Sequence, residues 1–125
     1  EITYLIIPGQ NDTPDEIRNF SHWAAEKLRP DTPVHFSRFH PDYNFRLAKS
    51  TPMDVLRHAH SIAKEQGLRY VYLGNVPHCD EENTYCPRCG SIAMERYGLR
   101  LVNDKTAEGK CSQCGEDLNL VLNVK

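Results

Sequence analysis

Two pairs of cysteines are the residues whose type and spacing most directly indicate chemistry. Cys86 and Cys89 form the first pair, Cys111 and Cys114 form the second, and each pair reads Cys-x-x-Cys-Gly. Thiolates in this pattern bind a tetrahedral metal ion, and the glycine lets the backbone turn tightly around the sulfur atoms. The interval between the pairs is slightly longer than usual, but the pattern still predicts a single metal site with four cysteine ligands.

The sequence around these cysteines predicts a zinc ribbon, in which each cysteine pair lies at the end of a β-hairpin. Residues 92–102 suit a hairpin, and residues 118–124 alternate like a further strand. The module has too few apolar residues to fold unaided, so the metal supplies folding energy. A closed site of four cysteines indicates a structural role. A rubredoxin-like iron site has the same ligands; zinc is favoured, although the spacing alone does not distinguish the two metals.

The fifth cysteine, Cys79, makes the total odd, which argues against a disulfide framework. Next to His78, it is either an additional ligand or reactive thiol, or an ordinary loop residue. The second interpretation is favoured because four ligands already close the metal site.

Residues 1–77 are expected to form a different kind of structure from the cysteine module, because strand and helix patterns alternate there. Apolar runs predict strands at 2–7, 34–39 and 70–73, and helical spacing predicts a helix in each interval. Thr13 and Thr51 each precede a proline and are expected to cap these helices. The repeat of strands is that of a βαβαβ series with parallel strands and right-handed crossovers.

The loops that follow parallel strands lie at one edge of the sheet, where α/β proteins usually bind ligands. His40 and Arg38 lie at the end of the second strand and Asn75 follows the third, so they are the candidate ligand contacts; His35, within the second strand, is a weaker candidate. Three histidines on the predicted helices are expected to face solvent: His22, His58 and His60.

Two such crossovers place both helices on one face of the sheet, whereas parallel sheets are normally covered on both faces. We therefore expect residues 1–77 to be the last strands of a partial TIM-like (β/α) barrel, with an open apolar face, and residues 78–125 to be a separate zinc-ribbon module. The alternative is that a second copy of the chain or the ribbon covers this face.

Composition excludes two classes of partner. The 125 residues include 15 Lys+Arg and 17 Asp+Glu, and this net charge of -2 argues against a nucleic-acid-binding surface. No apolar run approaches the roughly 20 residues that span a bilayer, so no membrane partner is expected. No signal peptide is evident, which predicts a cytoplasmic protein. The chain begins at Glu1, which leaves a truncated or processed chain open.

Four segments carry a resemblance to a known family: 7–12 (IPGQND), 35–43 (HFSRFHPDY), 72–77 (YLGNVP) and 82–87 (ENTYCP). With them the chain resembles the C-terminal part of radical S-adenosylmethionine (SAM) proteins related to pyruvate formate-lyase activating enzyme. The closest group is the radical SAM member of the AmmeMemoRadiSam system. The resemblance implies a partial TIM-like barrel and, in the complete protein, SAM and a [4Fe-4S] cluster that generate a radical acting on a protein substrate.

The same resemblance gives His40 the place of a histidine that lies near SAM in related enzymes. The family's Cys-x-x-x-Cys-x-x-Cys motif and its Gly-Gly-Glu segment are absent from this chain. The chain alone is therefore expected to be inactive and to have the missing N-terminal half of the barrel as a partner. The alternative hypothesis is a stand-alone zinc-ribbon module that binds another protein. The reading frame upstream of Glu1 distinguishes the two.

Overall fold

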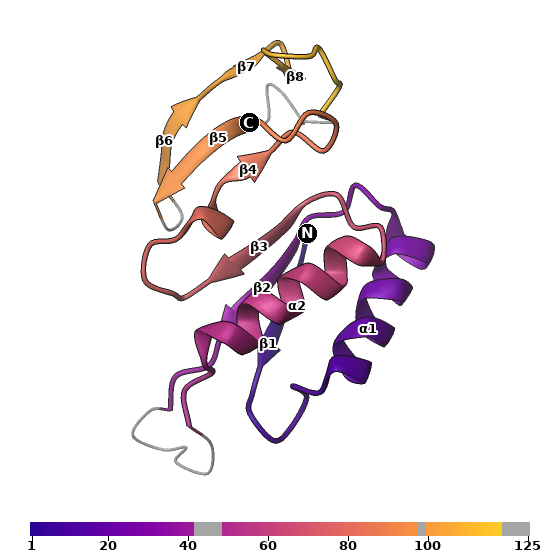
Figure 1. The fold of residues 1–125 in the computed structure, drawn as a ribbon, viewed down its shortest axis with the longest axis vertical. Coiled ribbons are helices and arrows are strands. Elements are labelled where there is room, and N and C mark those ends of the chain that lie inside the picture. Colours follow the sequence, from indigo (N-terminus) through magenta and orange to yellow (C-terminus); the bar gives the residue numbers. More distant parts are fainter. Residues whose placement is uncertain (42–48, 98–99, 119–125) are drawn as a thin grey trace.

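The computed structural model describes residues 1–41, 49–97 and 100–118. These residues form a mixed α/β structure: a parallel sheet with two helices comes first, and a small β module with four clustered cysteines follows (Figure 1). The predicted fold class is confirmed at this level. That the first part belongs to a barrel stays a prediction, as does the division at residue 77.

Three parallel strands form the first sheet: β1 (Ile2–Ile6), β2 (Val34–Arg38) and β3 (Val71–Gly74). Their order in the sheet is β1-β2-β3, as a βαβαβ series requires. The third strand begins one residue later than predicted and extends to Gly74. Among the strands that the structure describes, none pairs with the outer edge of β1.

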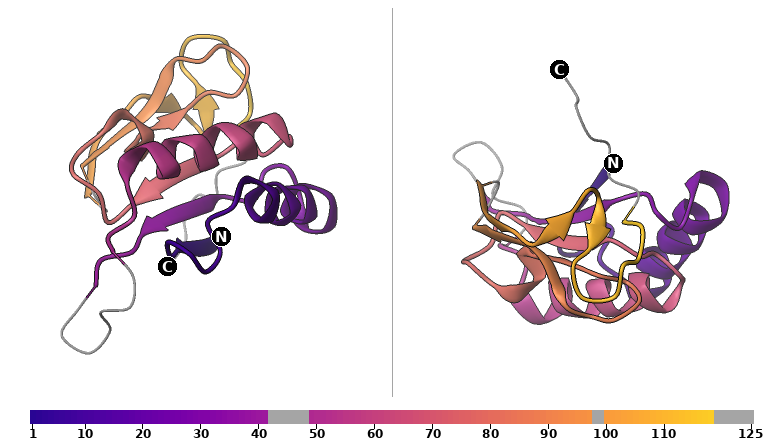
Figure 2. Two further views of the ribbon diagram at one scale, coloured as in Figure 1. Left: turned by 60° about the horizontal axis from the view of Figure 1, so that its bottom comes forward. Right: turned by 90° about the horizontal axis from the view of Figure 1, so that it is seen from above.

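Two helices connect these strands. The first comprises α1 (Pro14–Trp23) and a π-helical extension, η1 (Ala24–Leu28), and the second is α2 (Met53–Glu65). Figures 1 and 2 show α1 and α2 on the same side of the parallel sheet, as predicted. Their apolar stripes pack on that side of the sheet and bury a single core: Ile6, Ile17, Ala24, Val34, Phe36, Leu56, Ala59, Ile62, Ala63, Leu68, Val71 and Leu73.

The opposite face of the sheet corrects one prediction. Successive side chains of a strand point to opposite faces, so this face carries the residues between the core positions. Thr3, His35 and Tyr72 are register neighbours on it, with Leu5 and Ser37 in the next row. The His35 and Tyr72 rings stack with centroids 5.0 Å apart. The face not covered by helices is therefore mainly polar, and the expectation of an apolar face was wrong.

The two Thr-Pro helix starts, which are alike in sequence, differ in structure. The hydroxyl of Thr13 accepts a hydrogen bond from the Glu16 amide at 3.2 Å and caps α1, as predicted. Thr51 does not cap α2. The N-cap position of this helix is Pro52, and no side chain caps it. The Thr51 hydroxyl instead donates to the Ile6 carbonyl at 2.6 Å and accepts from the Phe39 amide at 2.9 Å.

Thr51 thus joins the C-terminal ends of β1 and β2 from a fully buried position. We expect Thr51→Val, which keeps the shape but removes the hydroxyl, to lower the free energy of unfolding by about 1–3 kcal/mol, because two backbone groups lose their partner. Chemical denaturation measures the change. Thr51→Ser, which keeps the hydroxyl, is the control; a Thr51→Val protein as stable as the unmodified chain would mean that the hydroxyl does not stabilise the fold.

The second part of the chain consists of short elements. The 3-10 turn η2 (Asp80–Glu82) leads into an antiparallel sheet, and the final strands pair as a small hairpin. The predicted hairpin at 92–102 is present as β5 and β6, with β6 extending beyond it. The strands are β4 (Thr84–Tyr85), β5 (Ile92–Tyr97), β6 (Arg100–Asp104), β7 (Thr106–Ala107) and β8 (Lys110–Cys111). The strand predicted at 118–124 lies outside the described residues except for Leu118.

Side chains of β3 and its preceding residue fasten the cysteine module to the sheet. The hydroxyl of Tyr70 donates to the Leu118 carbonyl at 2.9 Å, and burial raises the pKa of Tyr70 to about 12, so this donor stays protonated. Two residues further along the chain, the Tyr72 hydroxyl lies 2.8 Å from that of Thr84. The guanidinium of Arg96 lies over the Tyr72 ring. Figure 1 shows the module on the β3 side of the sheet.

No helix among the described residues is long and apolar enough to cross a membrane.

Candidate metal centre

The structure brings the four cysteines of the two Cys-x-x-Cys pairs together. Their sulfur atoms lie within 4.8 Å of one another. Across the two pairs, the Cys86 and Cys114 sulfurs are 3.5 Å apart, and those of Cys89 and Cys111 are 3.6 Å apart. A zinc ion with four bonds of about 2.3 Å holds its sulfurs roughly 3.8 Å apart. The four thiols can therefore hold a tetrahedral metal ion of this size.

Two backbone turns of the same kind present these sulfurs. The amide of Gly90 donates to the Cys86 carbonyl at 2.9 Å, and the amide of Gly115 donates to the Cys111 carbonyl at 2.9 Å. Both glycines have positive φ, +77° and +80°. A side chain is strained in this conformation, which explains why glycine follows each cysteine pair. The two-pair motif thus folds as the sequence predicts.

The surroundings of Cys111 favour the thiolate form of this ligand. Cys86 and Cys111 are buried and pack with Ala93 and Leu118. The Ser91 hydroxyl, followed by backbone amides, lowers the pKa of the Cys111 thiol to about 6. A thiol that loses its proton readily is a better metal ligand. Four protein ligands leave no open position for a substrate, which is the arrangement of a structural site.

Among the residues that the structure describes, these cysteines are the only group of three or more His, Cys, Asp or Glu side chains that can share a metal ion. Cys79 lies outside the group and packs against the core of the parallel sheet. Its amide donates to the Glu82 carboxylate at the start of η2. Burial raises the pKa of the Cys79 thiol, which disfavours a reactive thiolate. The interpretation of Cys79 as an ordinary loop thiol fits this environment.

The three predicted ligand contacts lie at the C-terminal edge of the sheet. Asn75, which has a φ of 54°, donates from Nδ2 to the Arg38 carbonyl at 3.0 Å and so joins the ends of β3 and β2. The Nε of Arg38 donates to the Thr51 carbonyl at 3.1 Å. His40 is exposed, with Nδ1 3.1 Å from the Ser50 hydroxyl. Their placement at one edge follows the parallel topology; their role in binding a ligand stays a prediction.

Asn11, which the sequence analysis did not single out, also supports this edge. The Asn11 side chain accepts from the Ile7 amide at 2.7 Å and donates to the Leu5 carbonyl at 2.8 Å. Tyr4 donates to the Asn11 carbonyl at 2.7 Å. An asparagine just after a Pro-Gly turn was the available signal, because its amide can bond to nearby backbone on both sides.

The helical histidines differ in their environments. His22 pairs with Glu26 on the exposed side of the first helix, and His58 is exposed, as predicted. His60 is instead half-buried, and its Nε2 lies 3.1 Å from the Val71 carbonyl. Burial lowers the pKa of His60, so the neutral ring donates one hydrogen bond to the backbone. The expectation of a solvent-facing His60 was wrong because α2 packs this position toward β3.

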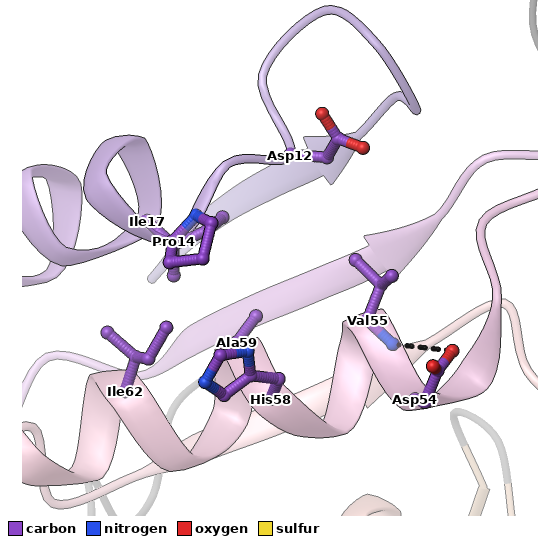
Figure 3. Close-up of a pocket in the computed structure, with 8 residues that line it drawn as sticks. All are labelled: Asp12, Pro14, Ile17, Asp54, Val55, His58, Ala59 and Ile62. Atoms are coloured by element: carbon purple, nitrogen blue, oxygen red, sulfur yellow. Dashed lines mark hydrogen bonds between the residues drawn. The ribbon is translucent and has the colours of Figure 1, made fainter.

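A groove of about 180 Å³ lies between the first turn of α1 and most of the length of α2. Figure 3 shows Ile17 of α1 facing Ala59 and Ile62 of α2, with the carboxylates of Asp12 and Asp54 toward one end. The walls are mainly apolar, and its acidic side chains belong to no group among the described residues that can share a metal ion. The groove is a packing feature of the two helices and carries no chemistry that the sequence predicted.

Comparison with known proteins gives a relative without an assigned function. The chain is 44% identical over 124 residues to the uncharacterised protein MJ0808 of Methanocaldococcus jannaschii. The match covers 98% of this chain but only 37% of that protein, so most of the relative lies outside the matched stretch. No protein-family model and no solved structure matches the chain.

Proposed function

We propose that this chain is the C-terminal part of a longer radical SAM protein related to glycyl-radical activating enzymes. Residues 1–77 contribute the last strands of its partial barrel, and residues 78–125 form a zinc ribbon with a structural role. The observation that carries the proposal is the parallel sheet, which has helices on one face and mainly polar side chains on the other. A barrel interior that binds a polar cofactor needs such a face.

The outer edge of β1, with which no described strand pairs, supports the same proposal. A (β/α) barrel is built by adding strands in chain order, so the strand before β1 would pair with this edge. The relative from Methanocaldococcus jannaschii contains far more chain than the matched stretch, which is enough to supply such strands. The cysteine module already contacts the face opposite the helices at Tyr72, through Thr84 and Arg96. A homo-oligomer that covers the rest of this face is the alternative.

The proposed cofactors belong to different parts of the protein. SAM, cleaved at a [4Fe-4S] cluster, supplies the radical that acts on a protein substrate. Within this chain, His40, Arg38 and Asn75 at the C-terminal edge of the sheet are the proposed SAM contacts. The cluster does not fit the cysteines described here, because four of them already form one group and Cys79 lies apart. Its ligands must come from the rest of the longer protein.

A second candidate function is a stand-alone zinc ribbon that binds a protein. Three large apolar side chains on the β5–β6 hairpin favour it: Tyr97, Leu101 and Val102 are all exposed. A reading frame that starts at this chain would support the second candidate. An upstream Cys-x-x-x-Cys-x-x-Cys motif in the same frame would support the first.

The proposed site predicts the effect of one substitution in the complete protein. With the cluster reconstituted under anaerobic conditions, His40→Ala should weaken SAM binding by about five- to tenfold, the equivalent of one net hydrogen bond of roughly 1 kcal/mol. The zinc content should not change, because the ribbon folds around its own four ligands. Titration with SAM and elemental analysis measure the two effects.

His22→Ala is the matched control, because His22 is exposed on the outer face of the first helix and pairs only with Glu26 among the contacts described. It should leave SAM affinity unchanged. Equal affinities for the His40 variant and the unmodified protein would remove His40 from the site.

A further inference from the structure

We propose that Ser91 supports the metal site from outside the ligand set: its hydroxyl lies between two thiolate ligands, donates its proton to one or the other, and strengthens metal binding. This inference rests on the proposed metal site and adds to it a residue beyond the four ligands. The Ser91 Oγ lies 3.0 Å from the Cys89 sulfur and 3.5 Å from the Cys111 sulfur. These two cysteines belong to different pairs, so one hydroxyl bridges both halves of the site.

The local backbone fixes Ser91 in this place. Ser91 directly follows Gly90, and its carbonyl accepts a hydrogen bond from the Cys86 amide at 2.8 Å. The turn that shapes the first cysteine pair therefore also determines where the Ser91 side chain starts. Its hydroxyl is partly buried, and the only side-chain hydrogen bonds described for it are those to the two sulfurs.

The second cysteine pair has no equivalent donor among the described residues. Glu116 occupies the corresponding position, because its carbonyl accepts from the Cys111 amide at 2.9 Å. Its carboxylate lies 3.6 Å from the guanidinium of Arg69 and 4.0 Å from that of Arg88. Backbone amides donate to the sulfurs on this side, among them the Gln113 amide, 3.4 Å from the Cys111 sulfur. Among the described residues, Ser91 is thus the side-chain donor that the fold places against the ligands.

The physical effect follows from charge. Four thiolates on a divalent ion leave a net charge of about −2 at the site, and donors to sulfur stabilise that charge. One hydroxyl proton can satisfy one sulfur at a time, so its position between Cys89 and Cys111 divides the stabilisation between them. Loss of a group that hydrogen-bonds to a ligand typically weakens metal binding by about 10- to 100-fold.

Cobalt(II) is the probe, because a tetrahedral thiolate site gives it a visible spectrum and zinc then competes for the same ligands. In this chain, Ser91→Ala should weaken zinc affinity by about tenfold, the lower end of the range for a group that supports a ligand. It should also shift the thiolate-to-cobalt charge-transfer band to longer wavelength, because a sulfur without its donor gives up charge more easily. Ser91→Thr keeps the hydroxyl and should restore both properties.

Ser112→Ala is the matched control, since Ser112 lies inside the second cysteine pair, is exposed and makes no side-chain hydrogen bond among those described. It should leave the band and the affinity unchanged. An unshifted band in the Ser91→Ala protein would overturn the inference even if affinity fell, because a purely structural role moves only the affinity. If the unmodified chain gives no tetrahedral cobalt spectrum, the proposed metal site itself fails, and this inference fails with it.

Discussion

Replacing Cys111 with serine is expected to abolish stoichiometric zinc binding and to unfold the cysteine module. The unmodified chain should carry one zinc, and removing a buried ligand leaves three thiols around a site that requires four. Binding free energies of structural zinc reach about 10–16 kcal/mol and contribute directly to folding. The core of the module is too small to compensate: Cys86, Ala93, Cys111 and Leu118 are its buried members.

Elemental analysis measures the metal, and hydrogen exchange measures where protection is lost. Amides of 86–118 should exchange faster in the Cys111→Ser protein, and a chelator should produce the same pattern in the unmodified chain. Cys79→Ser is the control, because that thiol lies outside the cluster and packs on the other core. A chain without zinc or iron as purified, or a disulfide between any two of the four cysteines, would contradict the assignment.

The second large effect is a difference in cluster assembly and SAM cleavage between this chain and the longer protein proposed to contain it. After anaerobic reconstitution with iron and sulfide, this chain alone should show no [4Fe-4S] absorbance and form no 5′-deoxyadenosine from SAM. A cubane cluster needs at least three cysteine ligands, and Cys79 is the one cysteine that the four-cysteine group leaves over. The longer protein, treated in the same way, should show [4Fe-4S] absorbance and form 5′-deoxyadenosine from SAM.

Zinc should be added before reconstitution, so that iron does not occupy the ribbon. SAM cleavage by this chain would contradict the proposal, and so would a longer protein that contains the family's cysteine motif but assembles no cluster. In the second case the stand-alone interaction module becomes the better explanation.

Local sequence patterns predicted the cysteine site and most of the strands well. Both depend on neighbouring residues: a Cys-x-x-Cys-Gly turn closes within a few positions, and a run of apolar β-branched residues needs no distant partner to be a strand candidate. The cap at Thr13 also follows from the adjacent sequence, and the structure contains it.

Interactions between residues far apart in the sequence explain why the predictions for Thr51 and His60 were wrong. Thr51 has the same local pattern as Thr13, but the Ile6 carbonyl lies close enough to take its hydroxyl. His60 was expected to face solvent because polar residues of amphipathic helices usually do, yet β3 runs beside it. The open face was expected to be apolar by analogy with fully covered sheets, although alternate residues of β1–β3 already read as Thr3, Leu5, His35, Ser37 and Tyr72. The alternation was present in the sequence but was not used.

The contacts between β3 and the cysteine module have a consequence for self-association. β3 is the outermost strand on its side of the parallel sheet, and exposed edge strands offer unpaired backbone groups to other chains. The module lies beside this edge, held by Tyr70 to Leu118 and by Tyr72 to Thr84. If the module unfolds without its metal ion, as expected above, β3 loses this neighbour, and we expect a second molecule to be able to add a strand at the uncovered edge.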